Sequence, residues 1–159
     1  MIRRILVTLD GSQLAEDVLP HVEDLARRLP AEVYLLQVIS LSPGVAAAES
    51  GLGAVTNAEL VSELLESEIQ TAKSYLSRLA SEWQARGLSV QWEVIRGEPA
   101  SGIVDSAQSH DIDLIAMSTH GRSGLSRLIS GSVAEQVIRE AGRPVLVIRP
   151  VEKAANPSE

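Results

Sequence analysis

The sequence has no cysteine, no excess of basic residues and no apolar run long enough to cross a membrane. Without cysteine, the chain can form neither a disulfide nor a thiolate that ligates metal or acts as a nucleophile. Its 14 lysines and arginines stand against 21 aspartates and glutamates, which gives a net charge of -7. Binding to nucleic acid needs basic residues that neutralise phosphates, and a membrane span needs about 20 apolar residues. We therefore expect neither nucleic acid nor a membrane as a partner.

Length and composition indicate a single globular domain. The chain has 159 residues, of which 45% are hydrophobic, and this is enough to bury a substantial core. We expect residues 1–150 to form the domain and the polar, aperiodic residues 151–159 to form a flexible tail. The apolar segment at 2–7 is too short for a signal peptide and has no cleavage site after it, so a cytoplasmic protein is expected.

Strand-like and helix-like patterns alternate along the chain. Continuous apolar runs are typical of buried strands, and apolar residues that recur every three or four positions are typical of helices. Strands are expected at 2–9, 33–39, 88–95, 112–117 and 144–148, and helices at 14–29, 59–86, 100–109 and 132–141. The apolar stripe of the longest helix comprises Leu60, Leu64, Leu65, Ile69, Ala72, Leu76, Leu79, Ala80 and Trp83. The small, glycine-rich segment 40–57 has no period and is expected to be a long loop.

This alternation predicts the fold class, a single doubly wound α/β domain of the Rossmann-like kind. Buried parallel strands joined by helical crossovers form a sheet that is covered by helices on both faces. The expected strand order is 3-2-1-4-5, with the winding direction reversing between strands 1 and 4. Ligands of such sheets bind beyond the carboxyl ends of the strands at this reversal. The loops that meet there begin at Asp10 and Ser118.

The second of these loops is the most informative segment of the sequence. Gly121, Gly124 and Gly131 lie between the apolar run 112–117 and the helical pattern that starts at Ser132. A glycine-rich loop ahead of a helix lets backbone N–H groups approach a phosphate, and the helix N-terminus adds partial positive charge. The loop is neither a Walker A loop nor a G-x-G-x-x-G loop. It predicts either a phosphate site or a structural glycine-rich turn, and Ser132 fits a phosphate ligand as well as a helix cap.

The spacing of the loop resembles the signature G-x-x-G, nine residues, G-[ST] of the universal stress protein family. Here the signature falls on Ser118, Gly121 and Gly131-Ser132, with serine in place of the first glycine. Further segments resemble the strands of that family: 5–12 the first strand and turn, 35–38 the second strand, and 142–148 the last strand. The resemblance covers residues 2–149, and members with the full motif bind ATP.

The resemblance implies an adenine-nucleotide site. It implies adenine near Thr8, Leu9, Asp10 and Val38, and phosphates on the loop and helix start. The complete set of candidate nucleotide-binding residues is Thr8, Leu9, Asp10, Val38, Met117, Ser118, His120, Gly121, Arg122, Gly131, Ser132 and Val133. The Asp10 carboxylate could accept a hydrogen bond from a ribose hydroxyl or from the adenine amine, or it could cap the first helix. Arg122 fits a partner of the phosphates or a solvated loop residue. ATP is the expected ligand, with ADP or AMP as alternatives, and Mg²⁺ is expected to be held mainly by the phosphates.

The function predicted from these features is that of an adenine-nucleotide-binding stress-response protein, a nucleotide-dependent switch or chaperone-like partner. The alternative is a dimeric interaction protein of the same fold that binds no nucleotide. A small hydrolase is a weaker alternative, because the spacing of a G-x-S-x-G nucleophile elbow is absent. No catalytic residue is assigned. At most, slow ATP hydrolysis or self-phosphorylation is expected.

The last strand predicts a homodimer. Pro144–Ile148 is apolar on both faces, yet the predicted strand order places it at the edge of the sheet. An open edge is a template for association unless it is covered. Pairing with the same strand of a second copy, around a two-fold axis, would satisfy its open N–H and C=O groups.

Overall fold

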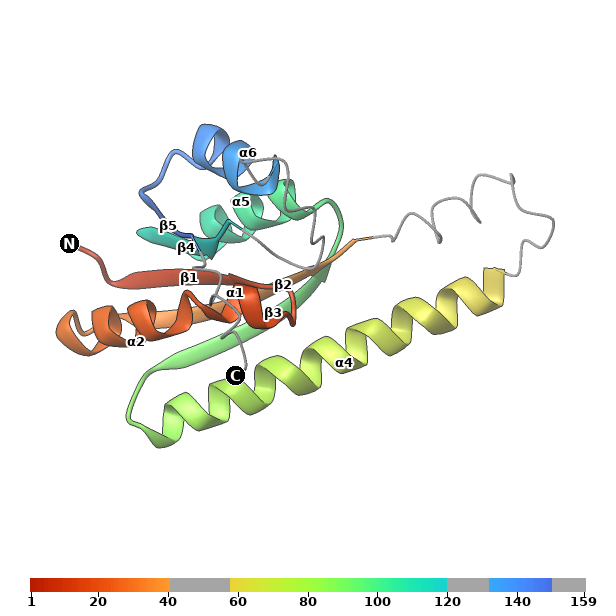
Figure 1. The fold of residues 1–159 in the computed structure, drawn as a ribbon, viewed down its shortest axis with the longest axis horizontal. Coiled ribbons are helices and arrows are strands. Elements are labelled where there is room, and N and C mark those ends of the chain that lie inside the picture. Colours follow the sequence, from red (N-terminus) through yellow and green to blue (C-terminus); the bar gives the residue numbers. More distant parts are fainter. Residues whose placement is uncertain (41–57, 120–131, 150–159) are drawn as a thin grey trace, which may run out of the picture.

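The computed structural model of the chain describes residues 1–40, 58–119 and 132–149 (Figure 1). The predicted tail 151–159, the predicted loop from residue 41 onward and most of the glycine-rich loop lie outside the described residues. Of the segments that are described, every predicted strand is present. Their bounds are β1 Arg4–Leu9, β2 Glu32–Ile39, β3 Val90–Arg96, β4 Leu114–Ser118 and β5 Val145–Ile148.

The strands form one five-stranded sheet in the order β3-β2-β1-β4-β5, and every pairing is parallel. This confirms the predicted doubly wound α/β fold. β1 lies at the centre, where it pairs with β2 on one side and β4 on the other. The winding therefore reverses between β1 and β4, and the carboxyl ends of these two strands lie next to each other.

Helices cover both faces of the sheet (Figure 1). Their bounds are α1 Gln13–Glu16, α2 Leu19–Arg28, α4 Ala58–Ala85, α5 Pro99–Ser109 and α6 Ser132–Glu140. One core forms where α1, α2 and α4 pack on the side chains of Ile5, Val7 and Leu35. The other forms where α5 and α6 pack on Leu6 and Ile115. Consecutive residues of β1 thus face opposite cores, as the alternation of a strand requires.

The single helix predicted at 14–29 is wrong, because the structure has two helices there, α1 and α2. Pro20 lies in the first turn of α2. Proline has no N–H, and its ring clashes with the carbonyl four residues earlier, so a helix cannot run through it without a kink. The chain instead ends α1 at Glu16 and starts again at Leu19. The apolar period continues across the break, which is why it suggested one helix.

The longest helix, α4, agrees with the prediction in its bounds but not along its whole apolar stripe. Leu76, Trp83 and their neighbours are buried against the sheet, whereas Leu60 and Leu64 are 51% and 50% exposed. The start of α4 extends past the ends of the strands (Figure 1). Periodicity marks the face of a helix that is apolar, but it does not reveal how far the sheet beneath that face extends.

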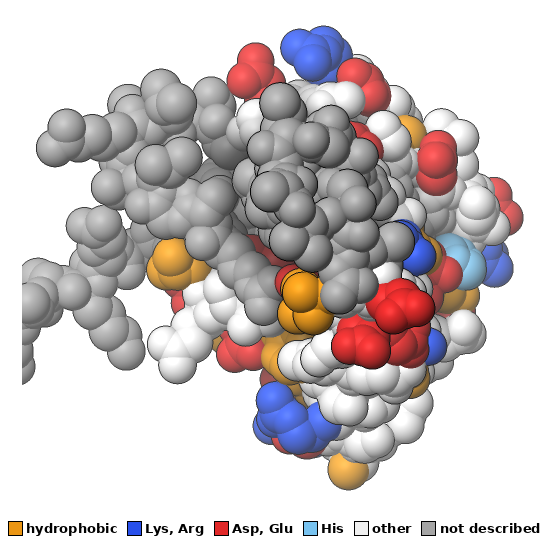
Figure 2. Space-filling model, turned by 90° about the vertical axis from the view of Figure 1, so that its right-hand side faces the viewer, with side chains coloured by type: hydrophobic (Ala, Val, Ile, Leu, Met, Phe, Trp, Pro, Cys, Tyr) orange, Lys and Arg blue, Asp and Glu red, His pale blue; other side chains and the backbone are white. Residues whose placement is uncertain are grey.

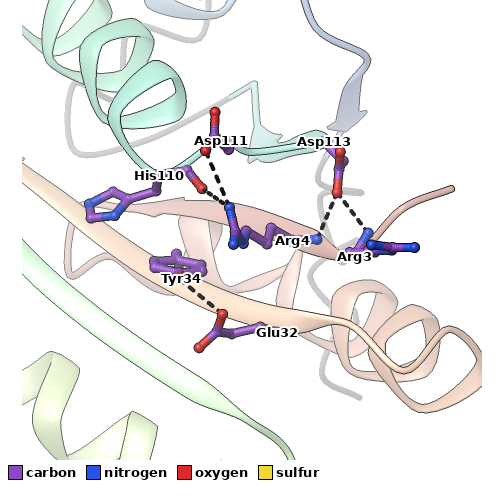
Figure 3. A network of polar contacts seen from close by, with 7 residues as sticks. All are labelled: Arg3, Arg4, Glu32, Tyr34, His110, Asp111 and Asp113. Carbon is purple, nitrogen blue, oxygen red and sulfur yellow. Dashed lines mark hydrogen bonds and ion pairs between the residues drawn. The ribbon is translucent and has the colours of Figure 1, made fainter.

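Polar contacts tie down the amino ends of the central strands (Figure 3). The carboxylate of Asp113 accepts hydrogen bonds from the backbone N–H groups of Arg3 and Arg4, at 2.8 and 3.0 Å. The Arg4 guanidinium donates to the carbonyl oxygen of His110 at 3.0 Å and lies 3.6 Å from the carboxylate of Asp111. These contacts join the start of β1 to the turn before β4, so this end of the sheet is held by groups far apart in sequence.

Candidate nucleotide pocket

A cavity of about 340 Å³ lies at the carboxyl ends of β1, β2 and β4. This volume falls within the roughly 300–1,000 Å³ that is usual for small-molecule sites. Its position is the one expected for a ligand of a doubly wound sheet, beside the reversal between β1 and β4. Its lining includes these residues predicted from the sequence: Thr8, Leu9, Asp10, Val38, Met117, Ser118, Ser132 and Val133. The remaining candidates, His120, Gly121, Arg122 and Gly131, lie outside the described residues.

The turn after β1 brings Asp10 to the cavity. Gly11 has φ +79°, a left-handed conformation that glycine adopts without a steric cost. The Asp10 carboxylate accepts a hydrogen bond from the backbone N–H of Ser12 at 2.9 Å, and the Ser12 hydroxyl accepts one from the N–H of Ala15 at 3.1 Å. Ser12 is therefore the N-cap of α1. Asp10 stabilises the turn that precedes the helix and at the same time lines the cavity.

The segment after β4 forms the opposite side of the cavity. The backbone N–H of Thr119 donates to the carbonyl oxygen of Ile148 at 3.0 Å, which extends the pairing of β4 with β5 to the cavity edge. Ser132 is the first residue of α6, and it lines the cavity together with Val133 and Ala134. The first backbone N–H groups of a helix have no partner within the helix and carry partial positive charge. This side of the cavity is therefore suited to an anion.

Apolar side chains form the wall of the cavity on the side of α5 and α6. Leu36 and Val38 of β2, Ile103 of α5 and Met117 of β4 line it. A Cβ built on Gly102 would lie 3.0 Å from Ile95 Cδ1, closer than ordinary van der Waals contact. Glycine at this position lets α5 approach the sheet closely enough to bring Ile103 to the cavity wall. An apolar wall next to polar groups is the usual composition of a site for a small molecule with a ring.

Acidic side chains mark the side of the cavity that is nearest to α4. Asp10 and Glu68 line it there, and Glu16 accepts a hydrogen bond from the hydroxyl of Tyr75 at 2.7 Å. Burial, the bond to Glu16 and the nearby charge of Asp10 raise the pKa of Tyr75 well above its usual range. On the face of the molecule that Figure 2 shows, acidic side chains are spread in several groups, with basic side chains near some of them. This side therefore favours hydrogen-bond donors over phosphates.

Sequence reasoning missed some of the residues that line the cavity. Gln37 is buried in β2, and Glu68, Pro99 and Ile103 reach the cavity from helices α4 and α5. A polar residue inside the apolar run of β2 was the available signal for Gln37. No local signal pointed to Glu68, because an acidic residue on a long helix is usually solvated.

Residues 1–40, 58–119 and 132–149 contain neither a cluster of metal-ligating side chains nor a helix that could span a membrane. No three histidine, aspartate or glutamate side chains gather there in an arrangement that could hold a metal ion. None of the helices in this part of the chain is long and apolar enough to span a membrane.

The structure defines a Rossmann-like α/β protein with a cavity at the reversal of its sheet, and known proteins share this fold. The model of the universal stress protein family matches residues 1–149. Universal stress protein MJ0531 of Methanocaldococcus jannaschii is 39% identical over 151 residues, covering 95% of this chain and 84% of that protein. The chain belongs to the universal stress protein family.

Solved structures agree with this assignment. Hypothetical protein MJ0577 of Methanocaldococcus jannaschii has a TM-score of 0.81 at 30% identity, covering 96% of this chain and 99% of that one. A universal stress protein of Archaeoglobus fulgidus in complex with dAMP has a TM-score of 0.61 at 24% identity, covering 93% and 98%. At that identity the second likeness concerns the fold alone.

Proposed function

We propose that this protein binds an adenine nucleotide, with ATP as the main ligand, and acts as a nucleotide-dependent switch or chaperone-like partner. The observation that carries the proposal is the cavity of about 340 Å³ at the reversal of the sheet. Its lining joins an apolar wall, the N-terminus of α6 and the acidic turn after β1. A nucleotide has a flat base, hydroxyl groups and an anionic tail, and each of these finds a matching region in the cavity.

The lining supports one orientation of the nucleotide. We place the phosphates at Ser132 and Val133, because the first N–H groups of a helix have no partner within the helix and attract anions. Ribose and adenine are placed toward Asp10 and Val38, since a carboxylate accepts from hydroxyl and amino groups and would repel phosphates. Mg²⁺ in this arrangement is held mainly by phosphate oxygens and water. The fold accommodates such a ligand, given that the Archaeoglobus fulgidus protein was solved in complex with dAMP.

Mass spectrometry of small molecules released from freshly purified protein tests the proposal. We expect ATP, or its products ADP or AMP, at a level comparable with that of the protein. Thermal unfolding with and without MgATP is a second test. A ligand whose concentration is 100 times its dissociation constant stabilises the folded protein by about 2.7 kcal/mol. Protein that releases no nucleotide and unfolds at the same temperature in millimolar MgATP would refute nucleotide binding.

The switch proposal includes a homodimer formed through β5. Among the described residues this strand is at the end of the strand order and pairs with β4 alone, and its residues Val145–Ile148 are apolar and partly exposed. Pairing of two such edges would cover these side chains and satisfy the open backbone groups. A dimer would also contain two nucleotide sites. The surface that it presents to a partner could then differ between the nucleotide-bound and the nucleotide-free protein.

The dimer proposal predicts that Val147→Lys weakens self-association, since it places a charge in the contact between the two edges. Sedimentation velocity at micromolar concentration should show a dimer for the parent and a shift toward monomer for the variant. Ile138→Lys, on the exposed side of α6, is the matched control and should leave the dimer intact. A monomeric parent protein would end the dimer proposal.

A further inference from the structure

Glu68 is an acidic side chain of α4 that lines the cavity. None of the ion pairs among the described residues includes Glu68, so they do not neutralise its charge. The described residues that line the cavity include a second carboxylate, that of Asp10, and no lysine or arginine. The negative charge of Glu68 therefore acts on the group that occupies this side of the cavity.

The packing of α4 on the sheet fixes the position of Glu68. Leu65 and Ala72, about one helical turn before and after Glu68, are buried in a cluster with Ile39, the last residue of β2. Residues with this spacing lie on one face of a helix. Glu68 therefore lies at the carboxyl end of β2, on the face of the sheet that α4 covers.

The apolar wall of the cavity belongs to the other face of the sheet. Ile103 and Met117 are part of the core that α5 and α6 cover, and Val38 packs against this core. In the proposed orientation the base lies on this wall, at β2, and the phosphates lie at Ser132, on the other side of β1. The ribose joins the base to the phosphates, so it crosses the carboxyl end of β1 beside Asp10. This is the acidic side of the cavity.

Building on the proposed nucleotide binding, we infer that Glu68 restricts the cavity to adenine nucleotides whose ribose hydroxyls carry no phosphate. A hydroxyl is neutral and donates hydrogen bonds to carboxylates. A phosphate on the 2′ or 3′ oxygen carries about −1.5 to −2 charges at neutral pH and is repelled by a carboxylate. Glu68 acts through its charge, so the selection needs no direct contact with the ribose.

Dinucleotide-binding proteins show that this kind of selection works. In them an acidic residue near the ribose favours NAD, whereas a nearby arginine accommodates the 2′-phosphate of NADP. In the present cavity Asp10 contributes a second negative charge. Removal of the Glu68 charge should therefore weaken the rejection of a ribose phosphate without abolishing it.

The experiment compares the parent with Glu68→Gln, Glu68→Lys and Glu63→Gln. Glutamine keeps the size of the Glu68 side chain and removes its charge. Glu63 is the matched control, because it is an exposed residue of the same helix, is absent from the cavity lining, and its replacement changes the net charge equally. Two ligands are titrated calorimetrically into each protein: ATP, and ATP with an additional phosphate on the ribose 2′ oxygen.

We expect the parent to bind the 2′-phosphorylated ligand at least about ten-fold more weakly than ATP, because like charges repel in a cavity with little solvent screening. Glu68→Gln should reduce this ratio at least about three-fold, and Glu68→Lys should reduce it further, since a lysine attracts the added phosphate. Glu63→Gln should keep the ratio of the parent.

The outcomes separate this inference from the proposed function. A parent that binds both ligands equally well overturns the inference. A ratio that both Glu68 variants leave unchanged overturns it as well, since the size of the added phosphate would then explain the rejection, and nucleotide binding would stand. An equal reduction in Glu63→Gln would assign the effect to the overall charge of the protein and contradict the role of Glu68. A parent that binds neither ligand refutes the proposed function, and this inference with it.

Discussion

The two ends of the parallel sheet are built differently. At the amino ends of β1 and β4, Asp113, Arg4 and Asp111 form a network that joins distant parts of the chain (Figure 3). At the carboxyl ends, a cavity opens, and the buried oxygen of Gln37 has no partner among the described residues. The comparison indicates that contacts at the amino end stabilise the fold, whereas the carboxyl end leaves a cavity of the size usual for a small-molecule site.

A physical reason for this division is the geometry of parallel strands. All carboxyl ends point the same way, so the turns after β1 and β4 and the start of α6 converge on one edge. Helix N-termini and strand ends bring unpaired N–H groups to that edge. At the opposite edge the chain returns from helices through short connections such as His110–Asp113, whose side chains and carbonyls bind the neighbouring strand.

The largest effect is expected in the core that both ends share. Ile115→Ala in β4 removes a side chain with 0% exposure, and truncations of this kind cost about 2–5 kcal/mol of unfolding free energy. Urea unfolding should show this loss, and nucleotide binding should weaken along with it. Ile138→Ala, at a residue that is 55% exposed on α6, is the matched control and should change stability by less than about 0.5 kcal/mol. Equal effects of the two substitutions would contradict the packing described for the core.

A pair of serine substitutions should separate binding from stability. Ser132→Ala removes a hydroxyl at the cavity and should weaken ATP binding by about 0.5–1.5 kcal/mol, with little change in stability. Ser106→Ala removes the buried hydroxyl that donates to Glu93, so it should lower the unfolding free energy by about the same amount and leave ATP affinity unchanged. Calorimetric titration and urea unfolding give both quantities. If the two variants behaved alike in both assays, the division between binding and stabilising groups would be wrong.

The smallest effect is expected at the carboxylate of Asp113, a partly buried residue. Hydrogen bonds from the N–H groups of Arg3 and Arg4 hold the pKa of Asp113 below its usual value. The stabilisation is complete above the unfolded-state pKa of about 3.9 and is lost as pH falls through the lower folded-state value. Asp113→Asn should therefore lower stability at pH 7, and the difference from the parent should shrink below about pH 4. Asp105→Asn, on the exposed side of α5, serves as the control. A difference that grows in acid would contradict the role assigned to Asp113.

Sequence patterns predicted the strand order and the position of the cavity, because both depend on features that repeat along the chain. Alternating strands and helices with right-handed crossovers leave few possible topologies. The break before Pro20 and the exposure of Leu60 and Leu64 escaped prediction for a different reason. The spacing of apolar residues shows only which face of a helix is apolar. Whether the helix continues depends on the backbone, here on proline, and whether its apolar face is buried depends on how far the sheet extends beneath it.

The candidate site divides in the same way. Asp10, Ser118 and Ser132 could be found from the sequence because they directly follow strands or start a helix at the expected edge. Glu68 and Ile103 reach the cavity through the packing of α4 and α5 on the sheet, which no local pattern encodes. Gln37 falls between these cases. Its polarity within β2 was visible in the sequence, but its unpaired oxygen became apparent only in the folded chain.

Hydrogen exchange of backbone amides with and without saturating MgATP tests the central claim most directly, since it reads both ends of the sheet in one measurement. The account predicts slower exchange in peptides that contain the carboxyl ends of β1, β2 and β4 and the first turn of α6. Peptides that contain Arg3, Arg4 and 110–113 should exchange at the same rate in both states. Unchanged exchange throughout, or protection confined to the amino ends of the strands, would contradict the claim that the carboxyl end of the sheet is the nucleotide site.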